Sequence, residues 1–228
     1  MSQIHLRLRG AAVAACLALT LSPASAAPTA VDLIFEAPYL SKAADGSTIS
    51  YRFVRKTDEK DLQPSFEDDV TINVGPTGAE KTVTIDMFTG ARAISMANMA
   101  RSGNPVVIAV LEQDVREMQK VLGGSPYYIR NRIMDAMRND RSAEPVKLDY
   151  DGRTVDGWKI KLSPFAGDQH RAQLKDFADR TYELTFADDV PGGLYALKSV
   201  TPKKDGGELL VEELTLKDSP GTLGASKP

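Results

Sequence analysis

Apolar and polar residues alternate in two blocks of the chain, which lie on either side of a segment with a longer period. Alternation with a period of two places successive side chains on opposite faces of a strand, one buried and one solvated. Sheets with one wet face are usually antiparallel, because parallel strands buried on both faces read as continuous apolar runs. In the first block the alternating segments are 49–53, 70–74 and 83–87.

The middle of the chain has a helical period, with apolar residues recurring every three or four positions. An asparagine and a proline at 104–105 form a start signal, and the glycine pair at 123–124 permits the left-handed conformation that ends a helix. A serine and a proline at 125–126 repeat the start signal before a second apolar stripe. We therefore expect two helices, over 105–122 and 126–138, joined by a short connection.

The second block returns to the period of two. An Asp-Gly turn signal at 151–152 separates its first two segments, with a loop longer than an ideal two-residue hairpin, and a short helix is expected after Asp168. The alternating segments are 146–150, 158–162, 182–186, 194–200 and 208–216. The pattern predicts an α+β fold: a curved antiparallel sheet, an open half-barrel or barrel-like, with an inserted two-helix segment and one further short helix. Closure of the sheet is left open by the pattern.

Residues 1–26 have the organisation of a secretory signal peptide. Two arginines precede an apolar run of eleven residues at 11–21, and small residues stand at positions 24 and 26, where signal peptidase requires them. A membrane-spanning helix needs about 20 apolar residues. We therefore expect cleavage after Ala26, a periplasmic mature protein and no transmembrane segment. A lipid-modified Cys16, preceded by small residues, is the minor alternative.

Loss of this segment changes what chemistry the chain can do. The 228 residues contain one cysteine, Cys16, and two histidines, of which only His170 follows the signal. A mature chain without cysteine holds no disulfide, thiolate nucleophile, iron–sulfur cluster or Cys/His zinc site. We expect neither a metal nor a cofactor, and we expect His170 to be an exposed residue of the short helix.

Charge and composition narrow the classes of partner. Removing the two signal arginines from 28 basic residues leaves 26 against 31 acidic ones, a net charge of −5. Net acidity argues against a nucleic-acid partner, whose phosphates require a clustered basic surface. With no repeat and no internal linker, 27–217 is expected to be a single domain, and the small, breaker-rich residues 218–228 a flexible tail.

Methionines and aromatic residues are the best candidates for contact with a ligand. The segment 92–101 has poor periodicity, and its methionines are flexible apolar residues suited to the rim of an apolar pocket. Tyrosine and tryptophan combine apolar area with a polar group, which suits a pocket mouth, although core packing accounts for single aromatics on strands. The candidate ligand-binding residues are Met96, Met99, Tyr127, Tyr128, Trp158 and Tyr195.

Clustered acids raise the alternative of carboxylate chemistry. Aspartates at 68–69, 149–151 and 188–189 are expected to form turns. A pair of carboxylates that meet in space can also hydrolyse glycosidic bonds. The alternative function is therefore a carboxylate-dependent hydrolase acting on envelope glycans, with Asp68, Asp69, Asp149 and Asp151 as the residues to substitute.

No catalytic motif was found, which favours a non-enzymatic protein. We expect an exported protein that binds an apolar ligand, for example a lipid, or an envelope protein on the concave face of its sheet. At the level of architecture alone, a signal peptide followed by a curved antiparallel sheet over helices is similar to bacterial periplasmic lipoprotein carriers and envelope-integrity proteins. A purely structural adaptor that works through a surface patch is a third possibility.

Overall fold

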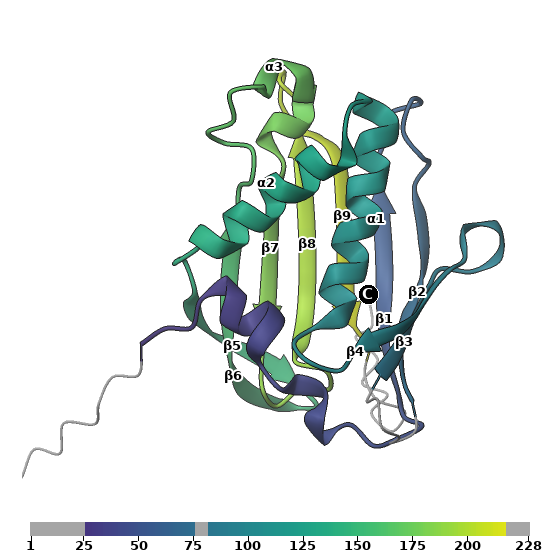
Figure 1. The fold of residues 1–228 in the computed structure, drawn as a ribbon, viewed down its shortest axis with the longest axis vertical. Coiled ribbons are helices and arrows are strands. Elements are labelled where there is room, and N and C mark those ends of the chain that lie inside the picture. The colour runs from purple at the N-terminus through teal and green to yellow at the C-terminus, as the bar shows by residue number, and fades with distance from the viewer. Residues whose placement is uncertain (1–25, 76–81, 218–228) are drawn as a thin grey trace, which may run out of the picture.

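The computed structural model describes residues 26–75 and 82–217, and within these nine strands form one antiparallel sheet (Figure 1). The spatial order of the strands is β4-β3-β2-β1-β9-β8-β7-β6-β5. The strands are β1 Thr48–Lys56, β2 Phe66–Val74, β3 Thr82–Met87, β4 Ile94–Ala100, β5 Glu144–Tyr150, β6 Arg153–Leu162, β7 Thr181–Phe186, β8 Leu194–Pro202 and β9 Glu208–Leu216. The predicted signal cleavage and the C-terminal tail depend on residues outside this part of the chain, so both stay predictions.

Two meanders form the sheet, and pairing of the first strand with the last joins them. Strands β1 to β4 follow one another, as do β5 to β9, and β1 pairs antiparallel with β9 from Tyr51↔Leu216 to Lys56↔Val211. The edge strands β4 and β5 do not pair, so the curved sheet stays open. The predicted α+β class is confirmed, and the structure decides the question of closure in favour of the open sheet.

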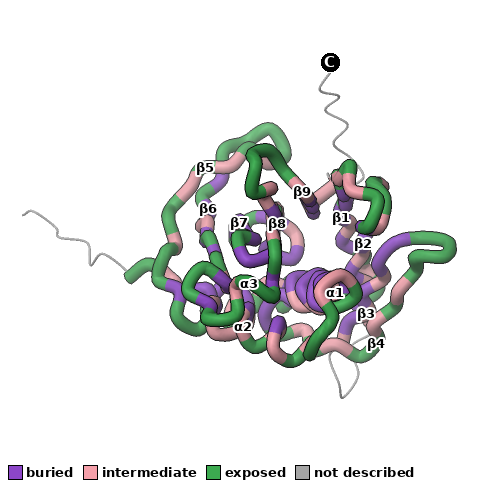
Figure 2. Tube along the Cα trace, turned by 90° about the horizontal axis from the view of Figure 1, so that it is seen from above, coloured by how far each residue is buried: buried purple, intermediate pink, exposed green. Residues whose placement is uncertain are grey.

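Helices α1 (Pro105–Leu122) and α2 (Pro126–Asn139) lie against the concave face of the sheet (Figures 1 and 2). The Asn104 side chain accepts a hydrogen bond from the backbone N–H of Val107 at 3.3 Å, as an N-cap does. Gly123 ends α1 with φ +71°. Both helices therefore begin and end where the sequence predicts them, within a residue.

Alternate residues of the strands form the core together with the inner faces of the helices. On β1, for example, Ile49, Tyr51 and Phe53 are buried, and they belong to one large cluster with residues of α1 and α2 such as Val115 and Ile133. Figure 2 shows buried stretches of the chain on α1 and on the central strands. The alternating apolar residues of the strands and the apolar stripes of the helices thus form opposite sides of the same core.

A segment that the pattern did not predict covers the lower part of the concave face (Figure 1). A π-helical turn (Asp32–Glu36) and a 3-10 turn (Tyr39–Lys42) lie there, and the Tyr39 ring stacks on Phe186 with centroids 6.0 Å apart. Gly193 permits this contact, since a Cβ at that position would lie 2.1 Å from the Tyr39 ring. Turns this short have no periodic signal from which to predict them.

One local expectation was wrong, and one strand was not predicted. The loop between β5 and β6 is a two-residue turn and not a longer one, because Tyr150 pairs with Arg153 and both turn residues, Asp151 and Gly152, have positive φ (52° and 71°), as a type I′ turn requires. The poorly periodic segment around residue 96 is strand β4. Its alternation is broken where the register shifts between β3 and β4, close to Asn98 at φ +59°.

Candidate functional site

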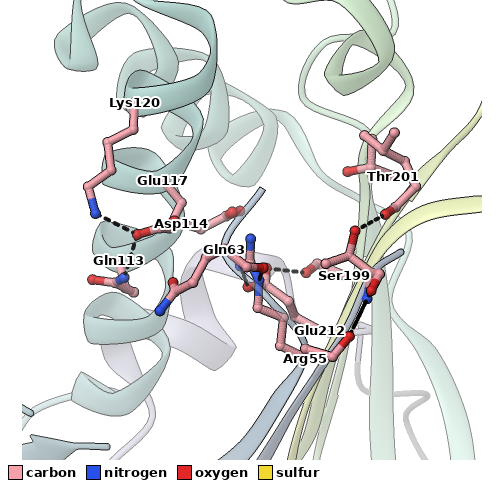
Figure 3. A network of polar contacts seen from close by, with 12 residues as sticks. Arg55, Gln63, Gln113, Asp114, Glu117, Lys120, Ser199, Thr201 and Glu212 are labelled. Atoms are coloured by element: carbon pink, nitrogen blue, oxygen red, sulfur yellow. Dashed lines mark hydrogen bonds and ion pairs between the residues drawn. The ribbon is translucent and has the colours of Figure 1, made fainter. Parts of the chain in front are cut away.

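Seven buried polar side chains meet between α1 and the middle of the sheet, and Figure 3 labels all of them except Arg180 and Tyr182. They come from α1, from the four central strands β1, β9, β8 and β7, and from the residue before β7. The set is Arg55, Asp114, Arg180, Tyr182, Ser199, Thr201 and Glu212. We call this set the buried network.

Arg180 is the centre of the buried network. Its guanidinium donates two hydrogen bonds of 2.9 Å to the Asp114 carboxylate and one of 2.5 Å to Glu212. The hydroxyls of Ser199 and Thr201 accept two further bonds of 2.8 Å. This pattern uses the planar fork of arginine on several acceptors at once.

The ionisation of the network follows from burial opposed by charge. Burial lowers the pKa of Arg180, but the Asp114 carboxylate, Tyr182 and Glu212 raise it above its ordinary value, so the guanidinium stays charged. Burial raises the pKa of Tyr182 well above its usual range, and Asp114 adds to the effect, so the hydroxyl remains protonated and donates to Asp114. Arg55 pairs with Glu212. Burial raises the pKa of Asp114, and the Arg180 charge opposes this rise. With both acids ionised, two cations face two carboxylates, and the network is neutral as a whole.

Because its charged groups bond one another, the buried network holds α1 against the sheet. The sequence pattern did not predict the buried network. Asp114 stands on the apolar stripe of α1, three residues after Leu111, and Glu117 three residues further on is also buried. Charged residues at stripe positions were the available signal, since a buried charge requires a partner.

A mostly apolar hollow lies at the end of the concave face, beneath the α1–α2 turn. Its volume is about 440 Å³, within the range of small-molecule sites. Helix α3 (Arg171–Leu174) forms the opposite wall. The lining residues are Leu122, Gly123, Gly124, Ser125, Tyr128, Ile129, His170, Gln173 and Leu174. We call this space the apical hollow.

Tyr128 and Asp168 hold the two walls of the apical hollow together. The Tyr128 hydroxyl donates to the Asp168 carboxylate at 2.6 Å, and the same carboxylate accepts the backbone N–H of His170 at 2.6 Å. Burial raises the pKa of Asp168, but these bonds and the nearby Arg132 charge outweigh it and bring the pKa below its ordinary value. The carboxylate that links α2 to the start of α3 is therefore ionised at neutral pH, and its hydrogen bonds are charge-assisted.

Of the six candidate ligand-binding residues, Tyr128 alone lines the apical hollow. Tyr127 is 71% exposed, with the Arg130 guanidinium 5.4 Å from its ring centre. Met96 and Met99 lie on the edge strand β4, partly buried against the main core. Trp158 lies on β6, near the opposite edge, and Tyr195 on β8 packs against a small second cluster around Val155. The structure thus distributes these residues over several places, and their role in binding stays a prediction.

The acidic clusters are also separated. Asp68 and Asp69 lie within strand β2 and not in a turn, so that expectation was wrong: the Asp68 carboxylate accepts the Thr89 N–H at 3.0 Å, and Asp69 pairs with Lys217 at 2.5 Å. The aspartates at 149–151 lie on β5 and in the β5–β6 turn, five to six strand positions away along the sheet. The two clusters therefore do not face each other across one cleft.

Among the residues that the structure describes, no three His, Cys, Asp or Glu side chains gather as metal ligands would. His170 is exposed at the start of α3, as expected. Within the same described ranges, no helix combines the length and apolarity needed to cross a membrane.

Comparison with known proteins gives a structural likeness but no sequence match. Neither a protein-family model nor a curated protein sequence matches the chain. Among solved structures the chain is similar to the lipoprotein LppX of Mycobacterium tuberculosis, with 11% sequence identity and a TM-score of 0.30, over 79% of this chain and 90% of that one. At this identity and TM-score, the likeness does not establish a shared fold or function.

Proposed function

We propose that this is an exported, non-enzymatic protein of the bacterial cell envelope that binds an apolar ligand in the apical hollow. The observation that carries the proposal is the hollow itself. Its floor is formed by the buried side chains of Ile129 and Leu174 with Leu122 beside them, and its rim carries the polar groups of Tyr128, His170 and Gln173. An apolar floor with a few polar groups at the mouth suits a molecule with an apolar chain and a small polar end.

Packing of the remaining concave face supports this location. The buried network and the main core fill the space between α1 and the central strands, so an apolar ligand on the concave face has its room at the end beyond Gly123. The walls there belong to the turn between two helices and to a four-residue helix. Such short elements adjust to a ligand more easily than the paired strands do.

Native mass spectrometry tests for the natural ligand. The full chain is expressed in a bacterium and recovered from the periplasm, and its mass is measured before and after organic extraction. We expect a bound mass that extraction removes and that identifies the class of ligand. Protein without a bound mass would instead favour the alternative that the chain binds an envelope protein and carries no ligand.

Substitution locates the binding in the apical hollow. The neutral apolar fluorophore N-phenyl-1-naphthylamine serves as the probe. Gln173 is an exposed residue of α3 that lines the hollow, so Gln173→Trp fills the space and should weaken probe binding by about tenfold or more. Ala172→Trp, at the exposed neighbouring position that does not line the hollow, is the matched control and should bind normally. Equal affinity for both variants would refute the location.

A further inference from the structure

A second and larger hollow lies on the other side of α1, against the turn that joins β3 to β4. Its volume is about 600 Å³. The C-terminal half of α1 forms one wall, the β3–β4 turn the second, and the loop before β2 the third. The residues that matter here are Phe88, Arg92, Ile94, Arg116, Lys120 and Val121. We call this space the lateral hollow.

The β3–β4 wall of the lateral hollow is held in a fixed shape. Phe88 has φ +65°, a conformation that costs a bulky residue about 1–3 kcal/mol and that glycine adopts more easily. Its ring packs edge-on against Phe53 and Phe66, with centroids 5.0 and 5.2 Å away. The aromatic cluster thus compensates for a strained backbone at the floor of the hollow.

Asp68 fixes the rest of the same turn. Its carboxylate accepts hydrogen bonds from the backbone N–H and the hydroxyl of Thr89, at 3.0 and 3.2 Å, and pairs with Arg92 at 3.5 Å. The Arg92 guanidinium also lies 4.6 Å from the centre of the Phe66 ring. Arg92 is therefore positioned before any ligand arrives, and its side chain remains 43% exposed.

Cations outnumber carboxylates in the lining of the lateral hollow, and Asp68, outside that lining, pairs with one of them, Arg92. Three cations, Arg92, Arg116 and Lys120, line it against two carboxylates, Asp61 and Glu117. Glu117 is already bonded to Lys120 at 2.8 Å and to Gln113 at 3.1 Å (Figure 3).

Arg116 is the cation that remains available. Its side chain forms no ion pair or hydrogen bond within the described part of the chain, although its charge helps to lower the pKa of Glu112. It is exposed on α1, across the lateral hollow from Arg92 on the β3–β4 turn. The hollow is thus flanked by one arginine that is held in place and one that is unpaired.

From these observations we propose that the lateral hollow binds a small organic anion with an apolar body. The body packs on Phe88, Ile94 and Val121, and a carboxylate or phosphate group binds Arg116 and the exposed N–H groups of Arg92. This site is separate from the apical hollow and does not depend on the proposed function.

Titration followed by two-dimensional NMR tests the site, with 2-naphthoate as the carboxylate probe and 1-naphthyl phosphate as the phosphate probe. At least one should give saturable shifts at the amides of residues 91–94, with a dissociation constant of about 1 mM or below for a ligand of this size. The tighter of the two identifies the anionic group. Neutral 2-naphthalenemethanol should bind at least about tenfold more weakly, since it lacks the charge.

Matched variants make the result specific. Arg116→Gln should weaken binding of the anionic probe by about tenfold or more, and Ala93→Trp, which fills the hollow from an exposed position, should abolish it. Arg138→Gln removes the same charge from an exposed place on α2 and should have no effect.

Three results would overturn the proposal: no saturation by either anion at 10 mM, equal binding of the neutral analogue, or equal losses in Arg116→Gln and Arg138→Gln. A loss confined to Gln173→Trp would overturn it as well, because it would place the anion in the apical hollow. Binding of the fluorophore in the apical hollow is measured separately from binding of the anion in the lateral hollow. One proposal can therefore fail without refuting the other.

Discussion

Replacing Arg180 by methionine is the most informative perturbation of the fold. Methionine fills a similar volume but removes the charge and every hydrogen bond that the guanidinium donates within the buried network. Asp114 and Glu212 would then share the single cation Arg55, which bonds to Glu212 and not to Asp114. A buried carboxylate would remain without its ionic partner.

The expected loss follows from this imbalance. Removing one member of a buried ion pair costs about 3–5 kcal/mol, a large part of a total stability of about 5–15 kcal/mol. For a domain of this size that corresponds to a fall of roughly 6–20 °C in Tm. Urea unfolding followed by circular dichroism, with thermal melts in parallel, measures both quantities.

A double variant separates the charge imbalance from the lost packing. In Arg180→Met with Asp114→Leu, the remaining pair of Arg55 and Glu212 is neutral, so we expect the double variant to be more stable than Arg180→Met alone, even though Tyr182 loses its acceptor. The reasoning is refuted if Arg180→Met costs less than about 1 kcal/mol, or if the second substitution lowers stability further.

Three further predictions concern the apical link, the N-terminal segment and the signal. The pKa of folded Asp168 lies below its ordinary 3.8, so its bonds stabilise the fold above about pH 4 and this is lost as the pH falls through the folded pKa. Asp168→Asn should therefore lose stability at pH 7 and progressively less below pH 3.8, as urea titrations across pH would show; a difference independent of pH would contradict this. Gly193→Ala should cost about 2–4 kcal/mol more than Gly46→Ala in thermal melts, because both glycines have φ near +75° but only the first faces a ring, that of Tyr39; equal losses would exclude the contact. Intact-mass measurement of periplasmic protein should find an N-terminus at Ala27, whereas a lipid-modified or uncleaved product would reject the predicted cleavage.

Local patterns in the sequence predicted most of the elements. Helix α1 could be located because the Asn104–Pro105 start, the apolar stripe and the Gly123 stop depend on residues within a few positions of one another. The same holds for eight of the nine strands, whose alternation is local. Strand β4 was missed because a register shift in its pairing with β3 disrupts the alternation, and that shift belongs to the pair and not to either sequence alone.

The candidate site was less accessible from the sequence. Tyr128 was identified as an aromatic suited to a pocket mouth, but the partner that holds it, Asp168, lies 40 residues further along. Asp114 was visible as a charge on an apolar stripe, yet its partner Arg180 is 66 residues away. No local pattern in a single sequence shows which distant residues come into contact. Neither the apical hollow nor the buried network could therefore be predicted from the sequence.

The sequence by itself determined the α+β class, the two-helix insert, the meander of the last three strands and the exclusion of cysteine chemistry from the chain that follows the expected signal. Each of these depends on residue type or on spacing within one element. Tertiary structure alone decided that β1 pairs with β9, that the sheet stays open, that Arg180 clamps α1 to the sheet, and that two hollows flank the end of α1. These features arise when segments far apart in the chain come into contact, and the free energy of such contacts depends on burial and partners that no local pattern records.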